Sequence, residues 1–251
     1  MNPSTRLSMQ LLLACGCALY LVVAHANVII GGTRVIFPAK DGEVTVRLTN
    51  QNNRPALVEA WIDGGDPRST PDKADTPFLI TPPLFRIEPK RDQSLRILFT
   101  HSDKPLPSDR ESVFWLNVLE IPPKPSGMQV QGKNYLQFAI RSRLKLFYRP
   151  AGLHGDAVKA PSELRFKAAS ADGKAALLVH NPTPYYVTIS HLTVAAGGVS
   201  HRVDAGMVAP LSDLRLAIPD LTQAPAAGST IEYSCINDYG ADVALQATLS
   251  P

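Results

Sequence analysis

The sequence is poor in cysteine, which excludes a fold stapled by several disulfides. It contains three cysteines, and two of them, Cys15 and Cys17, lie in an apolar stretch near the N-terminus. Cys235 is left alone, so no disulfide can form within the rest of the chain. Small exported domains often depend on disulfides. Domains built from this chain must instead rest on their hydrophobic cores or on a partner.

A strong excess of charge of one sign is also missing. The chain has 25 Lys and Arg against 22 Asp and Glu, which gives a formal net charge of +3 at pH 7. Proteins that bind nucleic acid usually carry a concentrated basic surplus. The charge balance therefore argues against a nucleic-acid partner.

Long apolar runs are limited to one, at residues 11–23. It follows Arg6 and precedes the small-residue cleavage pattern Ala24-His25-Ala26, which together predict a signal peptide at residues 1–26 that is removed. The alternative is a membrane anchor, but the run is shorter than the roughly 20 residues that a spanning helix needs. We expect an exported, soluble protein without membrane insertion, located in the periplasm.

The common catalytic motifs are absent. There is no GxSxG, no phosphate-binding glycine loop and no HExxH. No histidine beyond the predicted signal peptide has metal-ligand spacing with a cysteine or another histidine; these histidines are His101, His154, His180, His191 and His201. Cys235 lies in a predicted strand and is interpreted as a buried thiol. We expect no enzyme, no metal and no cofactor, although a hydrolase site assembled from distant residues would leave no such motif.

Alternating apolar and polar residues between turns are abundant, and they predict an all-β chain. The 22 prolines also fit many turns. Strands are expected at residues 27–37, 43–50, 56–62, 78–88, 94–100, 112–121 and 135–150, and then at 164–166, 175–180, 185–194, 199–203, 214–218, 231–236 and 243–249. About seven short strands is the number in an immunoglobulin-like sandwich. We therefore predict two such β-sandwich domains in tandem, at residues 27–148 and 153–251, joined at 149–152.

Two stretches carry further predictions. Gly31 and Gly32 interrupt the first strand and suggest a bulge or a switch point. Residues 135–150 alternate without a break, and at strand rise they would span roughly 50 Å. We predict that the second half of this long strand completes a domain core, and that the first half, with Leu136, Phe138 and Ile140, is lent to another protein. The alternative is an ordinary edge strand with one buried face.

Residues 106–122, LPSDRESVFWLNVLEIP, closely resemble the signature of the periplasmic pilus-assembly chaperones of chaperone–usher systems, the PapD-like family. The resemblance extends over nearly all of the predicted mature chain. It is supported by TPPLFRIEP at 81–89, KLFYRP at 145–150, NPTPYYVT at 181–188 and INDYG at 236–240. It implies two sandwiches in an L shape with a cleft between them.

The resemblance also implies a mechanism. Pilus subunits resemble immunoglobulin domains that lack their last strand, and the chaperone lends its own strand to fill the gap. Leu136, Phe138 and Ile140 match the donor residues of that strand. Arg34 and Lys145 match the cations that bind the subunit's C-terminal carboxylate; otherwise they would be solvated surface cations. Strict alternation places Lys145 on the strand face opposite Ile140, and a bulge or strong twist near residues 141–143 would reconcile the two roles.

Three further residues match a family network of ion pairs between the domains: Glu111, Arg149 and Asp238. Their implied role is to orient the two domains, and the alternative is three unrelated surface charges. Exposed pairs would contribute only about 0–1 kcal/mol, so an effect on stability requires partial burial.

The resemblance implies a non-enzymatic periplasmic chaperone that binds, folds and caps pilus subunits and delivers them to an outer-membrane usher. The alternative is a two-domain fimbrial subunit or adhesin. Such subunits usually carry a disulfide and an exchangeable N-terminal extension, and neither is visible in the sequence. When free, the chaperone could hide its exposed strand in a self-capped homodimer.

Overall fold

The computed structural model describes residues 28–100, 105–124, 134, 136–171, 174–219 and 221–250. The predicted signal peptide, His101, Tyr135 and most of the predicted loop before Tyr135 lie outside these residues. Within the described ranges the regular structure is β-strand, apart from three short 3-10 turns at Ala39–Asp41, Pro71–Lys73 and Ala160–Glu163. No described helix is long and apolar enough to span a membrane.

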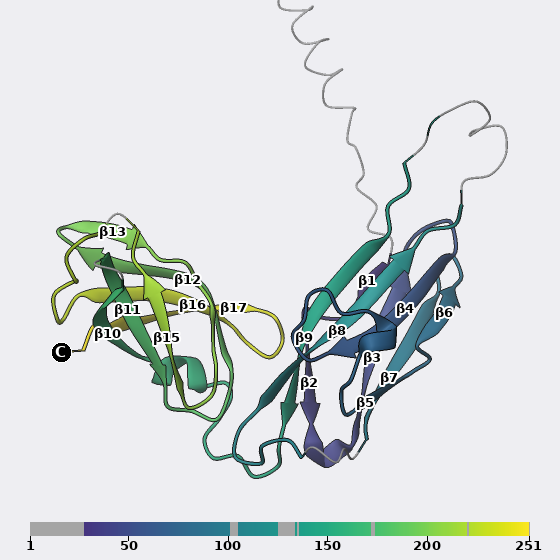
Figure 1. Cartoon of the computed structure of the whole chain (residues 1–251), viewed down its shortest axis with the longest axis horizontal. Helices are drawn as coiled ribbons and strands as arrows, with labels where there is room; N and C mark the ends of the chain where they lie inside the picture. Colours follow the sequence, from purple (N-terminus) through teal and green to yellow (C-terminus); the bar gives the residue numbers. More distant parts are fainter. Residues whose placement is uncertain are drawn as a thin grey trace, which may run out of the picture.

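The first nine strands form the N-terminal sandwich (Figure 1). They are β1 (Val28–Ile30), β2 (Arg34–Pro38), β3 (Glu43–Asn50), β4 (Ala56–Asp63), β5 (Phe78–Thr81), β6 (Leu84–Ile87), β7 (Asp92–Phe99), β8 (Ser112–Ile121) and β9 (Ile140–Arg149). One sheet has the order β1-β3-β7-β5 and the other β2-β9-β8-β4-β6. Alternate side chains from both sheets meet in the core, with Phe37, Leu48, Leu95 and Leu146 fully buried.

Gly31 and Gly32 are a switch point between these two sheets. β1 pairs with β3 in one sheet, and β2 pairs with β9 in the other. Gly32 has a φ of 132°, which side chains rarely adopt, and a Cβ at Gly31 would lie 3.2 Å from the Arg47 carbonyl oxygen. The interpretation of this glycine pair as a switch point is confirmed.

The remaining strands form the C-terminal sandwich. They are β10 (Arg165–Ala171), β11 (Lys174–Asn181), β12 (Val187–Ala196), β13 (Val199–Arg202), β14 (Met207–Val208), β15 (Ser212–Ala217), β16 (Thr230–Ile236) and β17 (Asp242–Thr248). The sheet β10-β11-β15 packs against the sheet β13-β12-β16-β17, with β14 beside β12. Cys235 is fully buried in this core, as predicted. Burial, together with the nearby Asp242, raises the pKa of its thiol to about 12.

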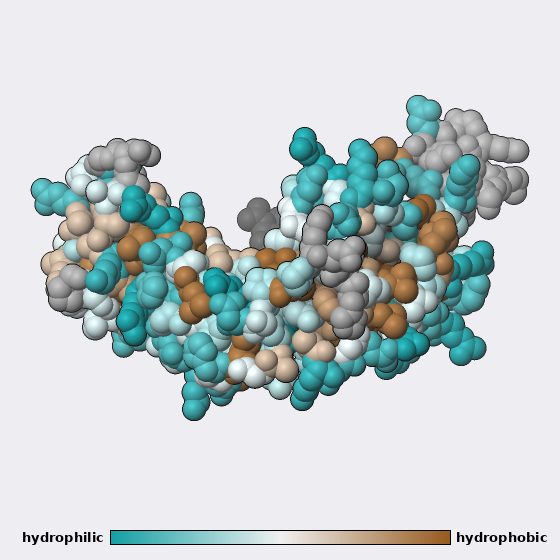
Figure 2. Space-filling model, turned by 60° about the horizontal axis from the view of Figure 1, so that its bottom comes forward, coloured by the Kyte–Doolittle hydropathy of each residue, from teal (hydrophilic) through white to brown (hydrophobic). Residues whose placement is uncertain are grey.

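The all-β architecture of two tandem sandwiches is therefore confirmed. The two domains form a bent outline with two lobes (Figure 1), and Figure 2 shows a concave surface between the lobes. The sequence pattern missed the two-residue strand β14, and it predicted one strand at 78–88 where the structure has two, β5 and β6. The exact domain boundaries at residues 148 and 153 stay a prediction.

The predicted strand at 135–150 is wrong at residues 136–139, because β9 begins only at Ile140. β8 and β9 pair in register from Ser112 opposite Tyr148 to Glu120 opposite Ile140. The same register would set Phe138 and Gln137 opposite Pro122 and Pro123. Proline has no N–H to donate, so the ladder cannot continue there. The Gln137 side chain instead donates to the Pro122 carbonyl oxygen at 2.7 Å.

The bulge expected near residues 141–143 is also absent from this pairing. The register between β8 and β9 is unbroken across residues 140–148. Lys145 and Ile140 therefore do lie on opposite faces of β9.

Candidate functional site

The first half of β9 has an open edge. β8 accompanies β9 along its whole length, but β2 accompanies it only from Lys145, which lies opposite Arg34, to Arg149. Among the described strands, residues 140–144 therefore have one neighbour, and residues 136–139 belong to none of these strands. An open edge presents unpaired backbone N–H and C=O groups to which another strand can add.

A row of apolar side chains on the core-facing side of β9 continues towards the N-terminus beyond the part that the domain core covers. Leu144 and Leu146, on that face, are buried. Ile140, Phe138 and Leu136, at the same alternate positions, are 52%, 68% and 78% exposed. Natural sandwiches normally avoid apolar side chains on an open edge, so these three side chains form a candidate docking surface.

Two cations lie where the open edge ends. Arg34 opens β2 and is paired in register with Lys145 of β9. The Arg34 Nη1 donates to the Ile236 carbonyl oxygen at 3.0 Å, and the Lys145 Nζ lies 3.4 Å from Thr188 Oγ1. Neither forms an ion pair with a carboxylate among the described residues, and the buried Arg34 Nε has no hydrogen-bond acceptor there.

The electrostatics of these cations favour an anionic ligand. Burial and the neighbouring Arg34 charge lower the pKa of Lys145. Burial also lowers the pKa of Arg34, and Asp238 offsets part of this effect. A carboxylate placed between the two would relieve their repulsion and accept charge-assisted hydrogen bonds.

Glu111, Arg149 and Asp238 meet at the domain junction. The Arg149 Nε donates to Glu111 Oε1 at 2.6 Å, and its Nη1 and Nη2 donate to Asp238 at 2.8 and 3.1 Å. Glu111 and Arg149 belong to the N-terminal sandwich, and Asp238 lies in the turn between β16 and β17. Glu111 Oε2 also accepts the Tyr186 backbone N–H at 2.8 Å, so the network holds both domains.

Burial distinguishes this network from a surface ion pair. The side chains of Glu111, Arg149 and Asp238 are 2%, 21% and 30% exposed. Burial raises the pKa of Glu111, although Arg149 opposes the shift. Burial would lower the pKa of Arg149, but the two carboxylates outweigh it and raise that pKa. The arginine therefore stays charged at the junction.

The turn that carries Asp238 rests against the N-terminal domain. Gly240 has a φ of 84°, and a Cβ at this position would overlap the Thr33 side chain. Thr33 directly precedes Arg34. The C-terminal domain therefore contacts the N-terminal one beside the cation pair, through the Gly240 turn and through Ile236 and Thr188.

Sequence reasoning missed a group of side chains on the outer face of β4, β8 and β9. It contains Trp61, Asp63, Trp115, Asn117, Arg141 and Arg143. The residues come from three separate strands, so only the pairing register brings them together. Tryptophan and arginine at alternate strand positions were the available signal.

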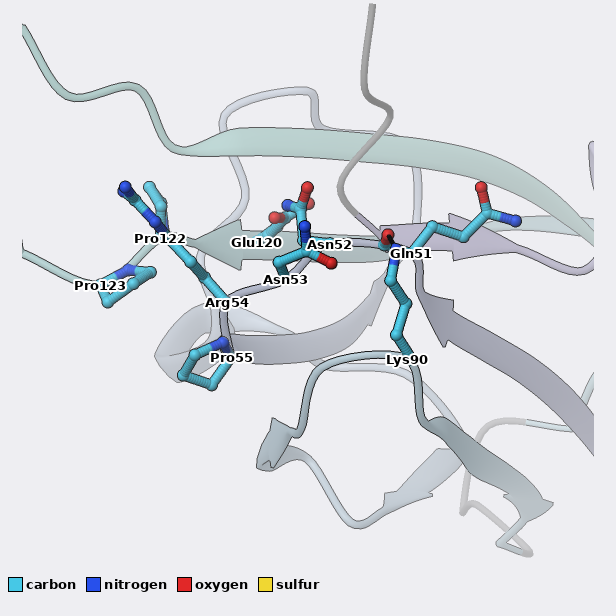
Figure 3. Close-up of a pocket in the computed structure, with 9 residues that line it drawn as sticks. All are labelled: Gln51, Asn52, Asn53, Arg54, Pro55, Lys90, Glu120, Pro122 and Pro123. Carbon is cyan, nitrogen blue, oxygen red and sulfur yellow. Dashed lines mark hydrogen bonds between the residues drawn. The ribbon is translucent and has the colours of Figure 1, made fainter.

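A separate hollow of about 320 Å³ lies near the end of β8 that carries Glu120 (Figure 3). Trp115, which pairs with Lys145, lies towards the other end of β8. Its walls are Gln51, Asn52, Asn53, Arg54, Pro55, Lys90, Glu120, Pro122 and Pro123. The Lys90 Nζ donates to the Gln51 carbonyl oxygen, and Glu120 accepts the Val28 backbone N–H at 3.0 Å. The lining contains no serine, cysteine or histidine that could act as a nucleophile or a general base.

Comparison with known proteins identifies the family. The family model described as "Pili and flagellar-assembly chaperone, PapD N-terminal domain" matches residues 27–154, and "Pili assembly chaperone PapD, C-terminal domain" matches 159–247. The probable fimbrial chaperone YadV of Escherichia coli K12 is 42% identical over 93% of this chain and 94% of its own length. Chaperone protein FimB/FhaD of Bordetella pertussis is 43% identical over 98% of this chain and 97% of its own.

Solved structures agree with this result. The crystal structure of YadV matches with a TM-score of 0.75 at 40% identity, over 89% of this chain and 100% of that one. The SafB chaperone, solved in complex with the Salmonella enterica SafA pilin, matches with a TM-score of 0.71 at 28% identity, over 91% and 99% of the two chains. The chain therefore belongs to the PapD-like family of pilus-assembly chaperones.

Proposed function

We propose that this protein captures pilus subunits by adding its open β9 edge and the preceding residues 136–139 to the subunit's incomplete sheet. The observation that carries the proposal is an open edge that ends at two cations, neither of which has a carboxylate partner among the described residues. The related SafB chaperone was solved with a pilin, which supports a pilin as the partner. Strand addition to a sheet edge is a common mode of peptide recognition.

The direction of β2 defines how a subunit strand would enter. β2 runs parallel to β9 and begins at Arg34, opposite Lys145. A strand that adds to the open edge in line with β2, and in the same direction, would end at these two cations. Its terminal carboxylate would lie between them, while Leu136, Phe138 and Ile140 fill the subunit's groove from the opposite face of the strand. The two roles need opposite faces, so no bulge is required.

Other parts of the function stay predictions. They are release of the subunit to an outer-membrane usher, a periplasmic location, and a self-capped homodimer of the free protein. The family is one of chaperones rather than enzymes. A two-domain fimbrial subunit is not favoured, because chaperone-domain models match both halves of the chain.

The test is capture of a subunit encoded beside this protein. Co-expression should yield a complex of one chaperone and one subunit that resists protease. Arg34→Ala should weaken capture by about 2 kcal/mol, or roughly 30-fold, because the terminal carboxylate loses a charged partner in a half-buried cleft. Arg96→Ala is the matched control, since Arg96 pairs with the exposed Glu43 on the other sheet. Equal protection of the subunit by Arg34→Ala and wild type would contradict the anchor.

Capture should also weaken as the pH rises. Burial and Arg34 lower the pKa of Lys145 in the free protein, and a bound carboxylate would raise it again. Binding is therefore strongest below the lowered pKa and declines as the pH passes from that value towards the pKa of the complex. Titration of a peptide with the subunit's C-terminal sequence between about pH 7 and pH 10 measures this.

Lys145→Arg is the control for this pH dependence. Arginine stays protonated over the whole range, so the variant should bind with a nearly constant affinity. If the variant and the wild type lose affinity in parallel, the titrating group is not Lys145. An amidated peptide should bind weakly at every pH, because it lacks the terminal charge.

A further inference from the structure

The outer face of the N-terminal sandwich carries a polar and aromatic cluster directly beside the open edge. We call it the Arg–Trp cluster; it consists of Trp61, Asp63, Trp115, Asn117, Arg141 and Arg143. The strand register explains the grouping, because Trp61 lies beside Asn117, and Asn117 beside Arg143, across β4, β8 and β9. Asp63 and Trp115 form the next row, which Lys145 continues.

The two arginines of β9 are held by stacking and by hydrogen bonds. The Arg141 guanidinium lies 4.8 Å from the Trp61 ring centre, and its Nε and Nη2 donate to Asn117 Oδ1 at 2.8 and 2.6 Å. The Arg143 guanidinium lies 4.7 Å from the Trp115 ring centre. Cation–π contacts of this kind hold both the position and the plane of the guanidinium group.

Asp63 is the centre of the cluster. Its side chain is 2% exposed. It accepts Arg143 Nη2 at 2.5 Å and Nε at 3.1 Å, Asn117 Nδ2 at 2.7 Å and the Gly65 backbone N–H at 2.7 Å. Burial alone would raise the pKa of Asp63, but these hydrogen bonds outweigh it and lower that pKa. The carboxylate is therefore charged and fully partnered.

The local backbone is shaped to complete this arrangement. Gly65 has a φ of 124°, and a Cβ there would lie 3.3 Å from the Trp115 ring. Only glycine lets the loop after β4 approach Trp115 and direct its N–H to Asp63. The apolar core cluster of the N-terminal sandwich contains none of the six residues. The cluster thus acts on the outer face, separately from the core.

Arg141 and Arg143 lie in the half of β9 that has, among the strands the structure describes, only β8 as a neighbour. A half-strand held by a single ladder opens more readily than one with neighbours on both sides. We propose that the Arg–Trp cluster, centred on Asp63, positions the donor segment by holding this half of β9 against β8 before a subunit arrives. The proposal rests on strand addition at this edge as the function. Asp63 would act through the arginines and would not contact the subunit itself.

Preorganisation of this kind acts on the rate of association. A disordered edge must be ordered during the encounter, whereas in the finished complex the subunit strand supports β9 from the other side. Asp63→Asn removes the charge that fixes Arg143 but keeps the shape of the side chain. We expect capture to become about tenfold slower, while the dissociation rate stays within about twofold of wild type.

The experiment uses the full mature protein and a subunit diluted from denaturant. Capture is followed as the appearance of the protease-resistant one-to-one complex, and dissociation by exchange with labelled chaperone. Hydrogen exchange of the free protein should show faster exchange at residues 140–144 in Asp63→Asn, with the rest of the sandwich unchanged. Asp92→Asn is the matched control, because Asp92 pairs with the exposed Arg47 on the opposite sheet.

Arg141→Gln provides a second route if Asp63→Asn folds poorly. It removes the Arg141 hydrogen bonds to Asn117 and to the Pro67 carbonyl oxygen and its 3.8 Å ion pair with Asp63, but it leaves the hydrogen bonds that Asp63 accepts in place. It should produce the same local exchange and slower capture. Wild-type capture rates in both variants would overturn the proposal. So would faster exchange throughout the domain, since that would mark a general loss of stability. If Arg34→Ala also captured normally, the proposed function itself would fail; if only the cluster variants did, the function would stand.

Discussion

Replacing Phe138 with aspartate should abolish subunit capture and leave the free protein folded. The Phe138 side chain is 68% exposed and belongs to no core cluster, so the isolated domain loses almost no buried apolar surface. In the complex, the same position would place an unpaired carboxylate in an apolar groove. The desolvation penalty of such a charge is several kcal/mol at least. We expect capture to be at least about a thousandfold weaker.

Two measurements check this result. Thermal unfolding of the free variant should match the wild type, and co-expression with the subunit should give no one-to-one complex. Val199→Asp is the matched control, because Val199 is 60% exposed and lies in β13 of the C-terminal sandwich. Its capture should be normal. Unfolding of the free Phe138→Asp protein would instead show that this ring fills a core, and would exclude the lent-strand mechanism for these residues.

Removal of Arg149 should destabilise the free protein by about 3–5 kcal/mol, because it leaves two carboxylates unpaired at the domain junction. Glu111 is almost fully buried, so water cannot replace the lost partner. The Arg149 guanidinium also lies 5.3 Å from the Tyr185 ring centre, and this contact is lost as well. Chemical denaturation of Arg149→Ala measures the change in the free energy of unfolding.

Arg96→Ala serves as the control for this second variant also. The Arg96 and Glu43 side chains are 52% and 44% exposed, and exposed pairs contribute only about 0–1 kcal/mol. If Arg149→Ala loses as little stability as Arg96→Ala, the network is exposed to solvent in solution. If the network only fixes the relative orientation of the domains, Arg149→Ala should change the small-angle scattering profile but not the free energy of unfolding.

The sequence pattern predicted the strands well, because burial of one sheet face requires strict alternation. Residues 43–50 and 112–121 show it clearly and form β3 and β8. The pattern failed at residues 136–139, where alternation continues but the strand does not. The reason lies in the neighbouring strand: Pro122 and Pro123 follow β8 and end its hydrogen-bond ladder with β9. The alternation of side chains within one strand does not show whether the neighbouring strand has backbone N–H groups to donate.

The candidate site was predictable in a similarly uneven way. Arg34, Lys145 and the three junction residues were found through resemblance to family motifs, and the structure places them in two groups at the domain boundary. The Arg–Trp cluster was missed because it joins three strands that are distant in the sequence: Asn117 is 56 residues from Trp61 and 24 residues from Arg141. Only the register of three strands shows that they share one face.

The glycine switch between β1 and β2 keeps the chain's own N-terminal residues away from the open edge of β9. If the first strand ran straight, its parallel register with β9 would continue backwards from Arg34, and Ile30 would lie opposite Arg141. The protein would then occupy its own open edge with its N-terminal residues, as an internal competitor of the subunit. Gly31 and Gly32 divert those residues onto β3 in the other sheet. The vacancy that a subunit fills is thus kept open by two residues that need never contact it.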